Sequence, residues 1–299
     1  MSIAEPTTSA PAPSKLSDTL QTISRSPAFV PGLILFTGII LIFWKMWPQL
    51  YDLWTGPDGY YSHGWLVPVI SGVIVYKAWP RIQNIPVRAE WIALIPLSIT
   101  LYLAWLSSAN LIYTFMAMAL LATISFSTWL IAGWRWMLAL APATLYLAFA
   151  LPLWTVLIND YTNPLQIYST KIAYYFLKIF GFGLVYDQVN EPTILYMDNF
   201  TLNVAVACSG LKLLLALTAF TTFFILIARL KWWGNLVMIG LILPLAMVIN
   251  GLRIGLVGIV GEMQNAEAGM TMHDYSGYIT LVICFFILFK FARWLGWKN

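Results

Sequence analysis

Residues 204–228 read VAVACSGLKLLLALTAFTTFFILIA, a stretch whose one charge is Lys212. An α-helix of about 20 predominantly apolar residues crosses the hydrocarbon core of a bilayer, so this stretch predicts a membrane-spanning helix. The whole chain fits that prediction, because 60% of its 299 residues are apolar and only 9% are charged. Soluble domains carry roughly 25% charged residues. The composition therefore excludes a cytosolic enzyme, a nucleic-acid-binding module and a secreted disulfide scaffold.

Similar apolar runs recur along the chain and predict an all-α polytopic membrane protein with about eight transmembrane helices. Residues 1–28 are rich in Pro, Ser, Thr and Ala and are expected to form a disordered cytoplasmic tail that is retained. Residues 29–299 then form one multi-spanning membrane domain with an extracytoplasmic insert at 158–203. The expected spans are 29–47, 63–79, 91–108, 111–131, 135–157, 204–228, 234–258 and 276–296.

The insert at 158–203 divides into two parts. Residues 164–182 are apolar and aromatic but are interrupted by Lys171 and Lys178, which favours a small helix lying at the membrane interface over a ninth span. Residues 193–204 alternate like strands around Asp198-Asn199, which predicts a β-hairpin with a two-residue turn.

The charges sort by side of the membrane when both termini are placed inside. Eleven of the 16 basic residues then fall on the cytoplasmic side and nine of the 12 acidic residues on the outer side, as the positive-inside rule requires. The cytoplasmic bases are Lys15, Arg25, Lys77, Arg81, Arg88, Arg135, Arg229, Lys231, Lys290, Arg293 and Lys298. The outer acids are Asp52, Asp58, Asp160, Asp187, Glu191, Asp198, Glu262, Glu267 and Asp274.

Three chemically active residues fall in one thin layer at the outer face, on the last three helices. Cys208 is expected in the first turn of its helix, roughly 6 Å below the surface, and Arg253 roughly 7–8 Å below it. His273 is expected just before the last span. A Cys/His pair is the usual arrangement for an activated thiolate, and a fixed guanidinium can stabilise an oxyanion or hold a substrate.

Each residue alone has an ordinary explanation. A membrane cysteine is most often an inert apolar residue, as Cys284 is expected to be in the middle of the last span, and an intramembrane Arg253 can simply bind helix carbonyls. His63, at the outer start of the second span, could be an interfacial anchor. Two histidines and one placeable cysteine make a poor metal site, so no metal and no other cofactor are expected.

The motifs around these residues resemble those of the exosortase/archaeosortase family of membrane cysteine transpeptidases. The chain has Cys208 in an Ala-Cys-Ser-Gly stretch, Asn250-Gly-Leu-Arg253 on the next helix and His273-Asp-Tyr-Ser-Gly before the last one. An early run from Tyr61 to Pro68 is also similar, and the likeness covers roughly residues 55–295; a cyanobacterial-type exosortase is one form it could take. Two positions depart from the family pattern: Val206 stands where an acidic residue is frequent, and Lys212 where Arg is frequent.

The resemblance implies a sorting enzyme at the outer face of a bacterial plasma membrane. Cys208, Arg253 and His273 would be catalytic, with Asn250, Lys212 and His63 as supporting or substrate-contacting candidates. The implied substrates are exported proteins with a C-terminal Pro-Glu-Pro-like motif, a transmembrane helix and a basic tail, and membrane lipids would surround the enzyme, with no role for nucleic acid. The alternative is a non-enzymatic transporter or scaffold for envelope or exopolysaccharide export, which would use Arg253 and Lys212 to contact anions and would leave the thiol without a function.

Overall fold

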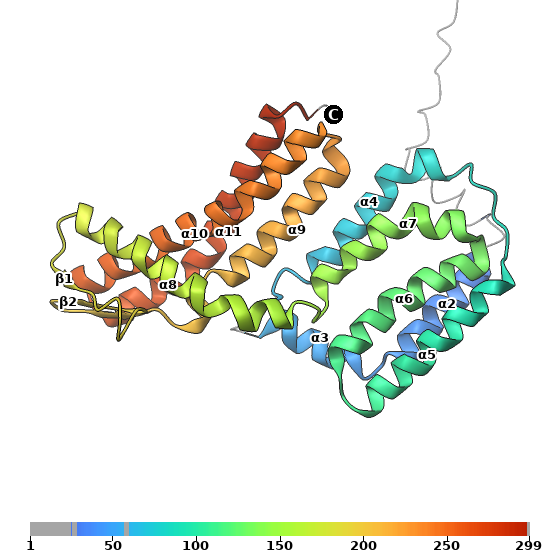
Figure 1. Cartoon of the computed structure of the whole chain (residues 1–299), viewed down its shortest axis with the longest axis horizontal. Helices are drawn as coiled ribbons and strands as arrows, with labels where there is room; N and C mark the ends of the chain where they lie inside the picture. The colour runs from blue at the N-terminus through green and yellow to red at the C-terminus, as the bar shows by residue number, and fades with distance from the viewer. Residues whose placement is uncertain (1–24, 26–28, 57–59, 298–299) are drawn as a thin grey trace, which may run out of the picture.

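The computed structural model describes residue 25 and residues 29–56 and 60–297, so the predicted tail at 1–28 lies outside the described residues except for Arg25. Most of the described chain is helical, as the apolar runs predict, and one small sheet accompanies the helices (Figure 1). The α-helices are α2 (Phe29–Ile42), α3 (Met46–Thr55), α4 (Leu66–Ile82), α5 (Leu94–Ala109), α6 (Tyr113–Ala132), α7 (Trp134–Tyr146), α8 (Thr155–Ile179), α9 (Leu211–Ala228), α10 (Trp232–Met263) and α11 (Ala266–Trp294). The short elements are 3₁₀ turns η1 (Trp91–Ala93), η2 (Leu147–Ala150) and η3 (Val206–Cys208), and strands β1 (Leu184–Val185), β2 (Ile194–Met197) and β3 (Thr201–Asn203).

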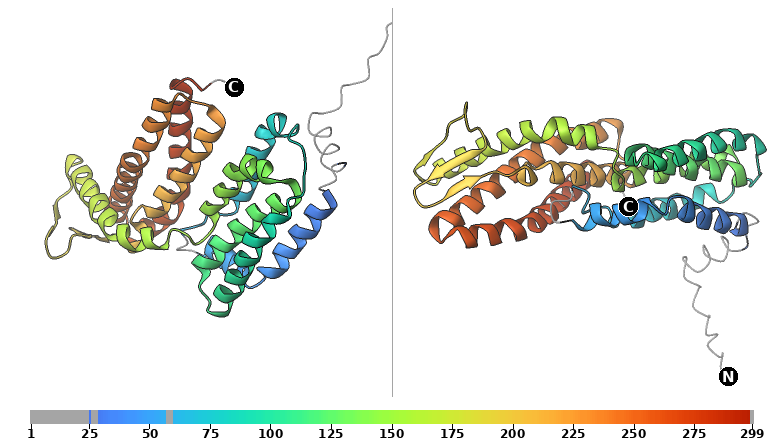
Figure 2. Two further views of the ribbon diagram at one scale, coloured as in Figure 1. Left: turned by 45° about the vertical axis from the view of Figure 1, so that its right-hand side comes forward. Right: turned by 90° about the horizontal axis from the view of Figure 1, so that it is seen from below.

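The helices form two groups that stand side by side. Helices α2 to α7 make one group, and α8 to α11 with the sheet make the other (Figures 1 and 2). The groups meet where α9 packs against α4 and α7. Buried side chains from both groups, including Val67, Tyr146 and Ala219, share a core at this junction.

The chain is a multi-pass membrane protein, but the eight predicted spans are not confirmed. Five helices in the described residues are long and apolar enough to cross a membrane, and α2 with α3 makes a sixth if that pair, bent by 78°, is one broken span. Helices α4 and α7 contain 17 and 13 residues, each with an internal proline, and fall short of that length. Many large apolar side chains remain exposed on the helices, as expected of surfaces that face lipid.

Several predicted helix boundaries are wrong. The expected span 29–47 breaks between α2 and α3, the expected span 234–258 continues to Met263 in α10, and three further differences lie near the site. The expected span 135–157 breaks after η2 at Leu151–Trp154, and its last residues join the expected interfacial helix in the 25-residue α8. The expected start at 204 moves to Leu211, because Gly210 has φ +88°, a left-handed conformation that stops a helix extending backwards. Helix α11 begins at Ala266 instead of 276, because the side chain of Asn265 accepts a hydrogen bond from the Ala268 amide and caps it.

The predicted hairpin is confirmed. Strands β2 and β3 pair antiparallel with Tyr196 opposite Thr201, which leaves Asp198-Asn199 as the two-residue turn. Strand β1 pairs with the other edge of β2. Because β1 is only two residues long, it was not predicted from the sequence.

Helices α8 and α10 pack closely through glycines. A Cβ atom added at Gly251 would lie 2.5 Å from Ile172 of α8, and one added at Gly255 would lie 2.4 Å from Phe176. These two glycines therefore let the α8 side chains reach the α10 backbone. The contact fixes where α10 lies along α8, the helix that precedes the hairpin and Cys208.

Candidate active site

Cys208 is the last residue of η3, in the connection between β3 and α9. The chain turns at Gly210, and Leu211 begins α9, so Cys208 lies three residues ahead of the helix and not in its first turn as predicted. The thiol is 8% exposed and belongs to a core formed by α8, α10 and the hairpin. Gln166 of α8 donates a hydrogen bond to the carbonyl of Val204 and so holds the chain just before η3.

His273 reaches the thiol from α11. Its Nε2 lies 2.5 Å from the Sγ of Cys208, across 65 residues of sequence. Its other ring nitrogen, Nδ1, lies 3.2 Å from the Oδ1 of Asp274. Because α11 starts earlier than predicted, His273 lies within the helix and the helix backbone fixes its position.

Arg253 of α10 holds the same turn of α11. Its Nε donates to the Ser276 hydroxyl at 2.9 Å, and its Nη2 donates to the His273 carbonyl at 3.1 Å. Ser276 in turn donates to that carbonyl at 3.0 Å. The guanidinium is also close enough to Cys208 to interact with its sulfur electrostatically. The arginine therefore acts on the thiol through its charge, and its two hydrogen bonds hold the turn of α11 that carries the imidazole.

Asn250 holds the other partner of the pair. It lies one helical turn before Arg253 and is 1% exposed, and its Nδ2 donates to the Cys208 carbonyl at 2.8 Å and to the Ser169 hydroxyl at 3.1 Å. Its side chain also fills the space beside Gly210, where an added Cβ would lie 2.8 Å from Nδ2. Its Oδ1 is buried without a hydrogen-bond partner among the described residues.

Ser276, Ser169 and Asp274 also belong to the site, although the sequence did not predict them. Ser276 and Asp274 stand in the quoted His-Asp-Tyr-Ser-Gly string, so the spacing of three residues between His273 and Ser276 was a usable signal. Ser169 comes from α8, and nothing in its local sequence distinguishes it from other helix serines.

The two remaining candidates, His63 and Lys212, interact electrostatically with each other. His63 is in the turn ahead of α4, is 6% exposed, and shows no well-formed hydrogen bond from either ring nitrogen to the described residues. Burial lowers the pKa of His63 to about 4; the backbone of Phe149 partly opposes this shift, and the positive charge of Lys212 adds to it. His63 is therefore neutral at physiological pH, and the Lys212 charge that acts on it comes from α9 in the second helix group.

The geometry supplies the parts of a nucleophilic centre. A thiol touches an imidazole, a carboxylate faces the far side of that imidazole, and a guanidinium stands beside both, which is the arrangement that activates a cysteine for acyl transfer. In the described part of the chain no three His, Cys, Asp or Glu side chains gather as a metal site would require. Cys284 is buried in a separate core between α9, α10 and α11.

Comparison with known proteins agrees with the motifs. The family model for transmembrane exosortases (Exosortase_EpsH) matches residues 44–290, which include every element of the site described above. Searches of curated proteins and of solved structures found no match. Because the match covers well over half of the sequence, the chain belongs to the transmembrane exosortase family.

Proposed function

We propose that the protein is a membrane-embedded cysteine transpeptidase that cleaves the C-terminal sorting signal of exported proteins. The observation that carries the proposal is the 2.5 Å contact between Cys208 Sγ and His273 Nε2. Family membership supports the same reading, since it suggests a membrane transpeptidase role.

In the proposed reaction, the thiol proton passes to His273 Nε2 as Cys208 Sγ attacks the scissile carbonyl carbon. The C–N bond of the tetrahedral intermediate then breaks, and Nε2 returns the proton to the leaving amine, which leaves a thioester on Cys208. An acceptor amine or water attacks that thioester and gives its proton to His273; the C–S bond then breaks, and the Cys208 sulfur that leaves takes the proton back from Nε2. The carboxylate of Asp274, 3.2 Å from Nδ1, would stabilise the protonated imidazole between these steps.

Arg253 would have two roles. Its hydrogen bonds to Ser276 and to the His273 carbonyl position the imidazole, and its charge beside the sulfur would stabilise the oxyanion or orient the substrate carbonyl. A lysine at this position would keep the charge but lose the planar fork that makes two hydrogen bonds at once.

The edge of the sheet suggests where an extended substrate would lie. Strand β3 pairs with β2 on one side only, and it ends five residues before Cys208. Because Val204 and Met197 bond across the hairpin at either end, the main-chain groups of Thr201 and Asn203 face away from β2. A peptide added to β3 would run toward the thiol.

The substrate class proposed is an exported protein with a Pro-Glu-Pro-like motif, a transmembrane helix and a basic tail. With both termini of the enzyme inside, the site lies at the outer face of a bacterial plasma membrane, where the scissile bond of such a protein would emerge from the bilayer.

Co-expression with a candidate substrate of this kind tests the proposal. Cys208→Ala should abolish cleavage, and Cys284→Ala should leave it intact as the matched loss of a buried thiol. Cys208→Ser should accumulate an ester to the substrate that resists hydroxylamine longer than the wild-type thioester. Cleavage that continues in a membrane-inserted Cys208→Ala variant would exclude the enzyme and leave the transporter or scaffold role.

A further inference from the structure

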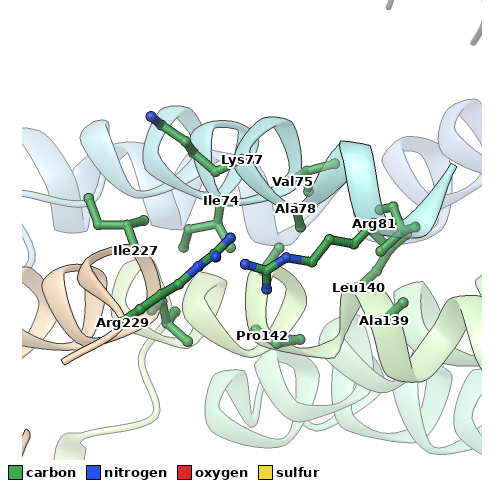
Figure 3. Close-up of a pocket in the computed structure, with 13 residues that line it drawn as sticks. Ile74, Val75, Lys77, Ala78, Arg81, Ala139, Leu140, Pro142, Ile227 and Arg229 are labelled. Carbon is green, nitrogen blue, oxygen red and sulfur yellow. The ribbon is translucent and has the colours of Figure 1, made fainter. Parts of the chain in front are cut away.

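A cavity lies between α4, α7 and α9, at the end of α9 remote from Cys208. Its volume is about 270 Å³, and its walls are apolar side chains such as Ile74, Leu140 and Leu226. Three cations line it: Lys77, Arg81 and Arg229. Figure 3 shows the guanidinium groups of Arg81 and Arg229 extending toward each other from α4 and from the end of α9, while the Lys77 ammonium points away.

The cavity carries positive charge with no acid to balance it. None of its lining residues is acidic, and across the described residues the one ion pair within 4 Å is that of His273 with Asp274. Two like charges that face each other across a partly apolar cavity repel each other. The arrangement is favourable when an anion sits between them, and two planar guanidinium forks match the oxygens of a phosphate.

The backbone at Arg229 supports a functional role for this side chain. Arg229 follows the last turn of α9 with φ +47°, a left-handed conformation that glycine adopts readily and arginine rarely does. The chain keeps arginine at this strained position although glycine would fit it better, and the side chain reaches back over the cavity (Figure 3). Such a residue at a strained position is a reason to look for a ligand.

The depth of the cavity in the membrane indicates which phosphate it binds. The 18-residue α9 is about 27 Å long at 1.5 Å per residue, close to the thickness of a hydrocarbon core; Arg229 follows its last residue, and Cys208 precedes its first residue by three. If the site around Cys208 is at the outer surface, the cavity is at headgroup depth on the inner surface. Its apolar walls continue from the cations toward the middle of the bilayer along α4 and α9, as an acyl chain would.

We infer that this cavity binds the headgroup phosphate of an anionic phospholipid of the inner leaflet between Arg81 and Arg229, with an acyl chain against Ile74 and Leu226. The bound lipid joins the two helix groups, because Arg81 belongs to the first group and Arg229 to the second. This site is separate from Cys208 and does not depend on the proposed peptidase activity.

Native mass spectrometry of the full chain, extracted from vesicles of equal phosphatidylglycerol and phosphatidylcholine, tests the inference. The wild-type protein should retain phosphatidylglycerol at least tenfold over phosphatidylcholine, and Arg81→Gln with Arg229→Gln should lose that preference. Arg293→Gln is the matched control, since it removes an exposed cation at the same end of the protein, outside the cavity and over the Phe289 ring. Phosphatidylglycerol should also raise the thermal midpoint of the wild type by several degrees and that of the double variant by less than one.

Two further measurements complete the test. Arg229→Gly suits the left-handed backbone, so it should fold with an unchanged or higher midpoint in phosphatidylcholine and still lose the phosphatidylglycerol shift. Inorganic phosphate at millimolar concentration should leave the midpoint unchanged; a shift equal to that of the lipid would mean a free-anion site and overturn the lipid assignment. Equal lipid retention by wild type and the double variant, or an equal loss in Arg293→Gln, would also overturn it.

Discussion

Removing the Asn250 side chain should separate catalysis from stability. Asn250→Ala deletes the hydrogen bond to the Cys208 carbonyl and the one to Ser169, each with a net contribution of about 0.5–1.5 kcal/mol. It also deletes the buried Oδ1 that has no partner in the described structure, but it leaves the Cys208 carbonyl without its donor, and these two effects oppose each other. The loss of the two hydrogen bonds then remains, so we expect the free energy of unfolding to fall by about 1–3 kcal/mol.

Catalysis has no such compensation. The Cys208 carbonyl loses its hydrogen bond from Asn250, so the segment that carries the proposed nucleophile can move relative to His273. A displacement of about 1 Å between reacting groups can cost about a hundredfold in rate. Asn250→Ala should therefore lower kcat for cleavage of a signal-bearing substrate by about a hundredfold, with KM little changed. Cleavage in proteoliposomes measures the rate, and thermal unfolding in the same detergent measures the stability.

Ser169→Ala is the matched control for this prediction. It removes the second acceptor of Asn250 and the long 3.4 Å hydrogen bond from the Ser169 hydroxyl to the Ser209 carbonyl, but it leaves the bond to Cys208 in place. We therefore expect kcat to stay within about threefold of wild type while the cost in stability is about 1 kcal/mol. A wild-type rate in Asn250→Ala would refute the positioning role. An equal loss of rate in Ser169→Ala would mean that the contact with α8, and not the contact with Cys208, is what matters.

Three further predictions follow from the same contacts. Ser276→Ala should destabilise the protein by about 1.5–3 kcal/mol in a thermal scan and lower kcat at least tenfold, because Arg253 loses its buried acceptor. Thr280→Ala is the control: its hydroxyl bonds only to its own helix, so it should change stability in the same scan by under about 0.5 kcal/mol. Gly251→Ala should cost about 1–3 kcal/mol in chemical denaturation through contact with α8, whereas Gly240→Ala, with no atom within 4 Å of the added Cβ, should be neutral or slightly stabilising. The pKa of His63 is about 4 in the folded protein, against 6.5 in the unfolded chain. Because the unfolded chain takes up the proton first, the free energy of unfolding should fall by about 3 kcal/mol as the pH drops from 6.5 to 4. His63→Gln should flatten this pH dependence of the thermal midpoint.

Residue chemistry made much of the site predictable, and local geometry made part of it unpredictable. Cys208, Arg253 and His273 could be placed together because short loops join the last three helices, which returns their ends to the same side. The start of α11 could not be placed, because residues 266–275 contain acids and small residues that resemble a loop by hydropathy. The Asn265 cap and close packing of Gly269 against Gly261 make that segment helical, and neither is visible without the fold.

The broken fifth span shows a second limit. Residues 135–157 are apolar enough to suggest one span, but the chain leaves helical geometry around Pro152 and Trp154 donates from its indole to the Ala148 carbonyl. Its amide also donates to the Tyr61 hydroxyl, 93 residues away. Hydropathy averages over such contacts, so it finds the apolar stretch and misses the break. Ser169 was missed for the same reason, because its role depends on how α8 packs after that break.

Helix α10 sets the distance between the thiol and the imidazole. Asn250 and Arg253 are three residues apart, so they lie on neighbouring faces of one helix about 4.5 Å apart along its axis. One donates to the main-chain carbonyl of Cys208 and the other to the main-chain carbonyl of His273. A movement of α10 as a whole therefore carries both anchors together and preserves the 2.5 Å contact, whereas the loss of either side chain releases one partner alone. The Asn-x-x-Arg spacing is thus explained by positioning as well as by charge: the same turn of helix that carries the guanidinium also holds Cys208 and His273, the two proposed reacting residues, at a fixed separation.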